Sequence, residues 1–167
     1  EHFDGPIAIR FARGVAFPEI KEDINLQYGK GQILKEGSKD GNNAGGNVAI
    51  IAVGSMVEET YKAIDMLEKE NVHPAFVNPV FIKPMDTELI KRVAENHKHI
   101  IVVEEGIKKG GFGESVETFI LERGIDADVQ VMAIDDRFVE QGNVALLREE
   151  IGISYKNIYE KVMELTR

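Results

Sequence analysis

Two arginines near the start of the chain are candidates for binding an anion. Arg10 and Arg13 lie at the end of the apolar run Ile7–Phe11 and just before Gly14. A guanidinium at the carboxyl end of a strand can hold a phosphate through two parallel hydrogen bonds. In so acidic a chain the same side chains could instead pair with surface carboxylates. The residues alone leave both interpretations open.

A pair of carboxylates and a glycine-rich stretch form a second candidate. Glu104 and Glu105 follow an apolar run and could act as acid and base. The glycines at Gly110, Gly111 and Gly113 precede an expected helix, where backbone N–H groups can bind an anion. The spacing lacks the full dinucleotide-binding pattern, and no Gly-Lys-Ser/Thr phosphate loop occurs. A tight turn with close helix packing is therefore the favoured interpretation.

The segment from Asp135 to Gly142 is the third candidate. Asp135 and Asp136 would supply half of a magnesium site, but an arginine and an aromatic residue follow them. We therefore expect an internal Asp–Arg ion pair that fixes the loop, with Phe138 placed at an interface.

The histidines do not predict a metal site. His97 and His99 are separated by one residue, and His2 and His73 lie far from them in the sequence. No cysteine or carboxylate motif accompanies them. No Gly-x-Ser-x-Gly nucleophile motif is present either. The sequence therefore predicts no self-contained active site.

The elements that position these residues alternate between strands and helices. Continuous apolar runs predict strands buried on both faces, near residues 48–53, 74–78, 100–104 and 129–134. Apolar residues at helical spacing predict helices at about 56–71, after Asp86, after Gly113, at 144–151 and at 154–165. Asp86 and Ser154 are the expected N-caps. This alternation predicts an α/β fold, a three-layer α/β/α domain with a mostly parallel sheet.

The first part of the chain lacks this regularity. The run Ile7–Phe11 predicts a strand whose edges have no partner nearby in the sequence. We therefore expect residues 1 to about 30 to be poorly anchored or to borrow contacts from a neighbouring chain. A short strand is expected at Gly31–Lys35 and a flexible loop at Gly37–Gly46. The polar opening without Met suggests a piece of a longer protein.

Composition narrows the function classes. The chain of 167 residues has 20 basic and 29 acidic side chains, a formal net charge of -9. This charge repels nucleic-acid phosphates and anionic lipids. No apolar run reaches the roughly 20 residues that span a bilayer, and no signal-peptide pattern opens the chain. The absence of cysteine fits a reducing cytoplasm, the expected location.

Taken together, several short motifs resemble the C-terminal part of the 1-deoxy-D-xylulose-5-phosphate synthases, which are members of the transketolase family. They occur in family order along almost the whole chain. The matching segments are Gly5–Gly14, Gly29–Gly31, Phe81–Asp86, Glu104–Gly106, Gly110–Gly113 and Asp136–Gly142. Each motif is weak alone, and together they are specific.

The resemblance implies a domain layout. Residues 1–14 would end with the last strand of the pyrimidine-binding domain, residues 15–45 would be a linker, and residues 46–167 would form the transketolase C-terminal domain. In that family the sheet is mostly parallel with one antiparallel edge strand. The domain mainly supports dimer contacts, so a homodimer and the remaining domains of the same enzyme are the expected partners.

The resemblance also implies a reaction. The family's enzymes condense pyruvate with glyceraldehyde 3-phosphate, using thiamine diphosphate and magnesium. In the family's Arg-Tyr-Pro-Arg-Gly pattern the second arginine holds the aldehyde's phosphate, and here that position is Arg13. No role carries over to Arg10. Phe11 and Ala12 replace the usual tyrosine and proline, and Gln141 stands where histidine is common.

The family's cofactor-anchoring and catalytic residues would lie upstream of Glu1. The chain alone is therefore expected to bind no cofactor and no metal and to be inactive. Alternatives are the equivalent region of a transketolase or of a 2-oxo acid dehydrogenase beta subunit, a non-catalytic interaction module, and a flavodoxin-like nucleotide binder. The last is disfavoured because no complete phosphate loop occurs.

Overall fold

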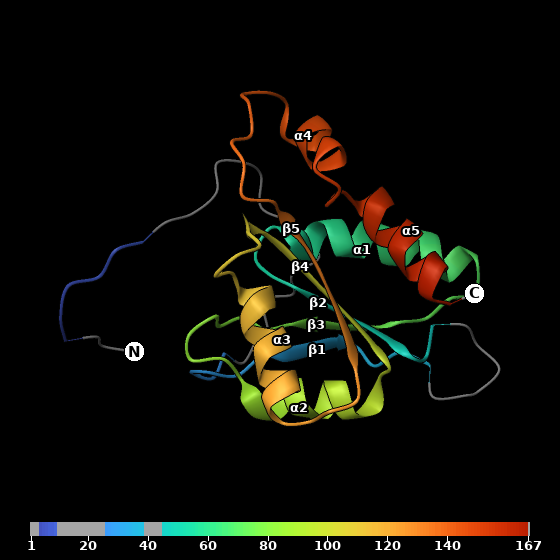
Figure 1. Cartoon of the computed structure of the whole chain (residues 1–167), viewed down its shortest axis with the longest axis horizontal. Coiled ribbons are helices and arrows are strands. Elements are labelled where there is room, and N and C mark those ends of the chain that lie inside the picture. Colours follow the sequence, from blue (N-terminus) through green and yellow to red (C-terminus); the bar gives the residue numbers. More distant parts are fainter. Residues whose placement is uncertain (1–3, 10–25, 39–44, 167) are drawn as a thin grey trace.

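The computed structural model describes residues 4–9, 26–38 and 45–166, and this part of the chain forms a five-stranded sheet of order β1-β3-β2-β4-β5 (Figure 1). The strands are β1 Gln32–Lys35, β2 Val48–Ala52, β3 Ala75–Asn78, β4 His99–Ile107 and β5 Asp128–Ile134. Neighbouring strands from β3 to β5 are parallel, whereas β1 pairs antiparallel with β3 at one edge. The predicted mostly parallel sheet and its antiparallel edge strand are both confirmed.

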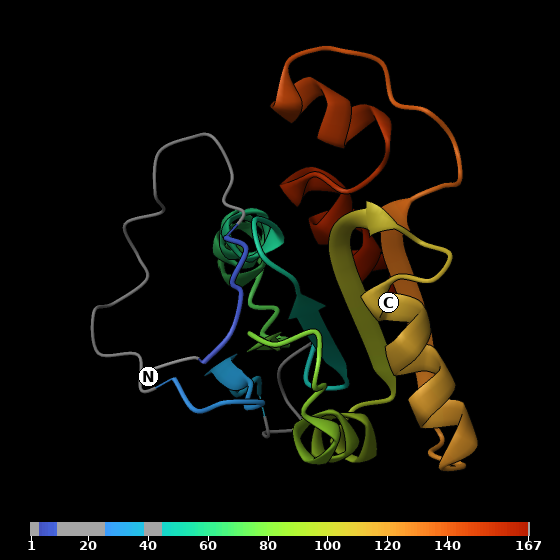
Figure 2. The ribbon, with the colours of Figure 1, turned by 90° about the vertical axis from the view of Figure 1, so that its left-hand side faces the viewer.

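Helices cover both faces of this sheet. They are α1 Met56–Lys69, α2 Thr87–Asn96, α3 Phe112–Glu122, α4 Val144–Glu150 and α5 Tyr155–Leu165. Figures 1 and 2 show α1 and α5 on one face and α2 and α3 on the other. The three-layer α/β/α architecture is therefore confirmed. Among the described residues, none of the helices is long and apolar enough to cross a membrane.

The core lies in two layers, one on each side of the sheet. Successive side chains of a strand point to opposite faces. Ile50 and Ile101 accordingly pack in the cluster beneath α1 and α5, and Ile51 and Ile100 pack in the cluster beneath α2 and α3. All four are fully buried. The continuous apolar runs of β2 and β4 are thus explained by helices on both faces.

Asp86 caps α2 and ties it to the edge strand. Its carboxylate accepts the backbone N–H of Leu89 at 3.2 Å and that of Gly31 at 3.1 Å, and it pairs with Lys30 Nζ at 3.3 Å. Burial is the largest single influence and raises the pKa of Asp86, but these hydrogen bonds and the charge of Lys30 outweigh it, so the pKa lies below its ordinary value. The predicted N-cap is confirmed.

The other elements lie close to their predicted positions. Ser154 caps α5, because its hydroxyl accepts the N–H of Asn157 while the Asn157 side chain accepts the Ser154 N–H. The first helix ends at Lys69, before Asn71 adopts a positive φ of 57°. Strand β4 runs to Ile107, three residues further than expected, because it continues to pair with β5 after a bulge.

The strand expected at Ile7–Phe11 is not present in the part of it that the structure describes. Residues 4–9 belong to no strand, and Ile7 and Ile9 are 63% and 81% exposed. Among the described residues this segment pairs with no strand of the sheet, and an extended segment without a partner is not stable as a strand. The expected weak anchoring is confirmed for these residues, and contacts with a neighbouring chain stay a prediction. Strand β1 lies within residues 15–45, so part of the expected linker joins the sheet.

Candidate functional site

The carboxyl edge of the sheet gathers most of the candidate residues. Parallel α/β sheets bind their ligands outside the carboxyl ends of the strands. Here this edge carries Ser55 just after β2, Glu104 and Glu105 within β4, and Asp135 just after β5. The contacts of these side chains decide which chemistry they can perform.

Glu104 is a helix cap. The residue is 6% exposed, and its carboxylate accepts the N–H of Phe112 at 3.1 Å and the N–H of Gly113 at 2.8 Å, the first two residues of α3. A carboxylate at this position satisfies free N–H groups and interacts favourably with the helix dipole. Since these N–H groups already have an internal acceptor, they cannot serve as a site for an external anion.

Glycine is required at two positions of this turn because neighbouring atoms leave no room for a Cβ atom. A Cβ atom on Gly111 would lie 2.5 Å from Glu104 Oε1, and one on Gly113 would lie 2.4 Å from Val131 Cγ1. Real side chains do not tolerate such distances. The interpretation as a tight turn with close helix packing is therefore confirmed.

Glu105 points the other way, as alternation along a strand requires. It accepts a hydrogen bond from Ser55 Oγ at 2.7 Å and one from Arg148 Nε at 2.9 Å. Burial, the largest influence, raises the pKa of Glu105, but Arg148 and Ser55 together lower it below its ordinary value. Because Glu104 and Glu105 have separate partners on opposite faces, the hypothesis of an acid–base pair is wrong.

Arg148 connects three parts of the chain. The sequence alone did not indicate it as a candidate residue. Besides Glu105, it contacts Glu59 Oε1 at 3.3 Å, and Glu59 Oε2 accepts the N–H of Tyr155 at 3.0 Å. Arg148 is only 15% exposed at its side chain. This network ties α4 to α1, β4 and the start of α5. A single arginine in a short helix gives no sequence signal for such a role, since its partners are 43 and 89 residues away.

The segment after β5 does not form the expected internal ion pair. Arg137 contacts Asp135 through the backbone only, its N–H lying 2.6 Å from the Asp135 carbonyl oxygen. Within the described part of the chain no side-chain ion pair involves Asp135, Asp136 or Arg137, and all three are exposed to water. Phe138 is fully exposed, so any interface that it forms lies outside this chain.

The histidines have structural contacts. His97 Nδ1 lies 2.8 Å from the Val93 carbonyl oxygen at the end of α2, and His99 Nδ1 lies 3.3 Å from Asp128 Oδ2 on the neighbouring strand. In residues 4–9, 26–38 and 45–166 there is no group of three His, Cys, Asp or Glu side chains that could hold a metal ion.

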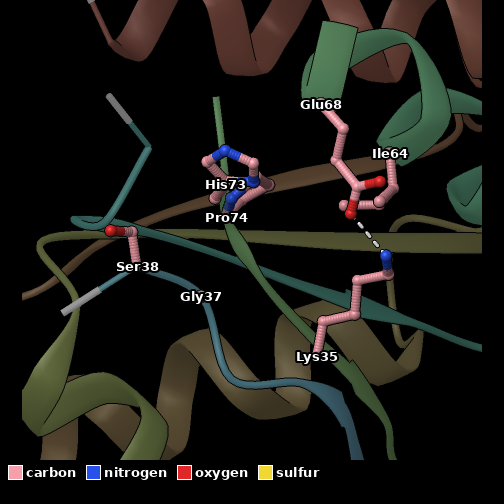
Figure 3. Close-up of a pocket in the computed structure, with 7 residues that line it drawn as sticks. All are labelled: Lys35, Gly37, Ser38, Ile64, Glu68, His73 and Pro74. Carbon is pink, nitrogen blue, oxygen red and sulfur yellow. Dashed lines mark hydrogen bonds and ion pairs between the residues drawn. The ribbon is translucent and has the colours of Figure 1, made fainter. Parts of the chain in front are cut away.

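A hollow of about 280 Å³ lies at the opposite, amino edge of the sheet (Figure 3). Lys35 and Glu68 form an ion pair across it, and the His73 ring lies beside it. His73 Nε2 is 3.3 Å from Asn71 Oδ1. The pocket holds one internally paired cation and no cluster of catalytic groups, so it is a weaker candidate than the carboxyl edge.

Arg13 and Arg10, the predicted phosphate ligand and its neighbour, lie outside the described residues. The carboxyl edge therefore shows a structural arrangement of carboxylates, a helix cap and an arginine clamp. This fold is a three-layer α/β domain with helices on both faces of a mostly parallel sheet.

Comparison with known proteins agrees with this class. The family model of the transketolase C-terminal domain matches residues 35–158. This chain belongs to the transketolase C-terminal domain family.

Two curated proteins similar to this chain are of one kind within the transketolase family. A 1-deoxy-D-xylulose-5-phosphate synthase of Heliobacterium modesticaldum is 35% identical over 98% of this chain and 24% of its own length. One of Alkaliphilus oremlandii is 37% identical over 95% of this chain and 24% of its own length. The resemblance inferred from the motifs is confirmed. The chain spans about a quarter of the length of these curated relatives.

A solved structure is also similar. It is described as a split-gene transketolase, an inactive beta4 tetramer, and it matches with a TM-score of 0.75 and 28% identity over 88% of this chain and 46% of that one.

The capping role of Glu104 can be tested by Glu104→Gln. The amide can accept one N–H, but its own NH₂ group would face the second donor, so we expect a loss of about 1–3 kcal/mol in the free energy of unfolding. Urea unfolding measures this loss. Glu117→Gln, on the exposed side of α3, is the matched control and should change little. An unchanged stability of Glu104→Gln would contradict the capping role.

The Glu105–Arg148 pair predicts a pH dependence. Because the folded-state pKa of Glu105 is lowered, its contribution is present above the ordinary pKa of about 4.3 and is lost as the pH falls through the folded value. Since Glu105 is 39% exposed, screening limits the contribution to about 1 kcal/mol or less. The difference in unfolding free energy between the natural chain and Glu105→Gln should therefore be constant above about pH 5 and shrink below about pH 4.

Glu150→Gln, an exposed residue of α4, is the control for this pH series and should show no such trend. A difference for Glu105→Gln that grows as the pH falls would reverse the sign of the assignment.

Proposed function

We propose that this chain is the C-terminal domain of a thiamine-diphosphate-dependent transferase that condenses pyruvate with glyceraldehyde 3-phosphate to 1-deoxy-D-xylulose 5-phosphate. The observation that carries the proposal is the 35% identity to a 1-deoxy-D-xylulose-5-phosphate synthase over 98% of the chain. The order of the motifs along the chain supports the same reaction. The whole reaction belongs to the intact protein, because the chain spans about a quarter of such relatives.

The cofactor is proposed to be held by other parts of the intact protein. Thiamine diphosphate supplies the carbanion chemistry of this reaction when it is bound, and Mg²⁺ anchors its diphosphate. The carboxylates at the carboxyl edge do not fit either group. Glu104 is occupied by the N-terminus of α3, and Glu105 is occupied by Ser55 and Arg148. We therefore assign no step of the cofactor's chemistry to these residues.

Arg13 is proposed as this chain's contact with substrate. By its match to the second arginine of the family's pattern, its guanidinium would hold the phosphate of glyceraldehyde 3-phosphate through paired hydrogen bonds. This contact would position the aldehyde and would not touch pyruvate.

The remainder of the chain is proposed to support assembly, as a homodimer and against the other domains of the enzyme. The carboxyl edge of the sheet exposes large apolar side chains, among them Tyr28, Ile82 and Phe138. Exposed apolar surface of this kind marks interaction sites. The similar split-gene chain is described as an inactive tetramer, which supports self-association and inactivity for a chain of this kind.

A transketolase is the second candidate, because the similar solved structure is one. The synthase and the transketolase activities can be distinguished by their donor substrate. In the intact protein, product formation from pyruvate and glyceraldehyde 3-phosphate with release of carbon dioxide supports the synthase. Transfer of a two-carbon unit from a ketose phosphate, with no use of pyruvate, would instead support the transketolase activity.

The Arg13 contact is tested in the intact protein by Arg13→Ala. Loss of a charge-assisted contact should lower kcat/KM for glyceraldehyde 3-phosphate by about ten- to a hundredfold. The kinetics toward pyruvate at saturating aldehyde and the affinity for thiamine diphosphate should stay nearly unchanged. Steady-state assays measure both.

Two controls separate the contribution of the phosphate contact from other effects of the substitution. Unphosphorylated glyceraldehyde should be used almost equally by the natural protein and Arg13→Ala, since it offers no phosphate to bind. Arg92→Ala removes an exposed arginine of α2 and should leave both substrates unaffected. An equal loss of kcat/KM for both aldehydes would make Arg13 a structural residue.

A further inference from the structure

The segment that follows β5 and ends with α4 contributes almost nothing to the core. Residues 135–146 are all exposed, and no residue of α4 is buried. Figures 1 and 2 show this segment passing beyond the carboxyl edge of the sheet before the chain enters α5. We call residues 135–150 the strap. Because burial of apolar surface is the main stabilising contribution in folding, other interactions must hold the strap in place.

One side chain provides most of the attachment. Arg148 Nε donates to Glu105 Oε1 at 2.9 Å, and Arg148 Nη1 donates to Glu59 Oε1 at 3.3 Å. The Arg148 and Glu59 side chains are only 15% and 7% exposed, so water screens this pair little. Within the described residues, the other side-chain ion pair that joins the strap to its surroundings links Glu149 to Lys156 at 2.9 Å. Both of these side chains are about half exposed, and such pairs contribute little.

The partners of this arginine would not be left alone if it moved away. Glu59 would keep Lys62 Nζ at 3.0 Å and the N–H of Tyr155 at 3.0 Å. Glu105 would keep the hydroxyl of Ser55 at 2.7 Å. A buried carboxylate that loses its last partner is strongly destabilising, but neither carboxylate would be in that position. The rest of the domain can therefore remain folded without the arginine contact.

The strap lies between two anchored positions. Before it, Ile134 is the last residue of β5 and is partly buried. After it, Ile153 is fully buried. Between α4 and this anchor lies Gly152, which has a φ of 81° and would have no atom within 4 Å of an added Cβ atom. The backbone can therefore change direction at this glycine without disturbing a packed neighbour.

We propose that the strap is a conformational device, which Arg148 holds closed and which detaches as a unit while the sheet and the other helices stay folded. Once released, α4 would lose its helical structure, because a helix of seven residues is not stable in isolation. Release would uncover Glu105 near the end of β4 and Ser55 just after β2, at the edge where parallel sheets bind their ligands. The inference concerns the chain itself and does not depend on the proposed reaction.

Hydrogen exchange of backbone amides, followed by NMR on the 167-residue chain, tests this release. The N–H groups of Leu147 and Ile151 are bonded within the α4 region at 2.9 Å. After correction for intrinsic rates, they should exchange at least about a hundredfold faster than those of Ile50 and Ile101, which open only when the domain unfolds. Low concentrations of urea should hardly change the fast rates, because release exposes little surface.

Substitutions at the attachment test the role of Arg148. Arg148→Ala should speed exchange in α4 by about tenfold or more, because hydrogen bonds between charged groups are lost. Alanine favours helix formation more than arginine does, so a faster rate would not come from helix propensity. Ile50 and Ile101 should remain far better protected than α4. Arg148→Lys keeps the charge but not the planar fork, and its effect should be smaller.

Lys156→Ala is the matched control, because it removes only the exposed pair with Glu149. It should change exchange in α4 by less than about fivefold. An α4 that exchanges only together with Ile50 and Ile101, with the same dependence on urea, would overturn the proposal. It would also be overturned by α4 amides without protection in the natural chain, or by equal effects of Arg148→Ala and Lys156→Ala.

Discussion

Strands β2 and β4 are covered by helices on both faces, and every other feature of the domain depends on this burial. Their side chains alternate between two core layers, which fixes the register of the whole sheet because a shift by one residue would exchange the layers. At the end of β4 the same alternation sends Glu104 toward α3 and Glu105 toward α4. The helices at the carboxyl edge are thus positioned by two adjacent carboxylates that act in opposite directions.

This arrangement gives both carboxylates at the carboxyl edge internal partners. The N–H groups that could bind an anion are satisfied by Glu104, and the carboxylate that could act as a base is paired with Arg148. The segment between β5 and α4 stays exposed, with apolar side chains such as Phe138 and Leu146. We therefore propose that the chain contributes contacts to a larger assembly, with Arg13 as its contact with substrate.

The sequence predicted the sheet well, because continuous apolar runs and N-cap residues are local signals. The runs at residues 48–53 and 129–134 and the cap at Asp86 gave elements that the structure contains. The partners of Glu105 and Arg148 could not be predicted, since they are brought together by the fold from distant positions. The expected Asp–Arg pair was wrong for a related reason. Neighbours in an exposed loop are separated by water unless the fold forces them together.

We propose that this chain is part of a thiamine-diphosphate enzyme and does not itself hold the cofactor. Isothermal titration calorimetry of the 167-residue chain with thiamine diphosphate and Mg²⁺ tests it most directly. We expect no saturable heat of binding with the chain alone and clear binding with the intact protein under the same conditions. Saturable binding of the cofactor by the chain alone, abolished by substitutions at its carboxyl edge, would show that this chain does hold the cofactor.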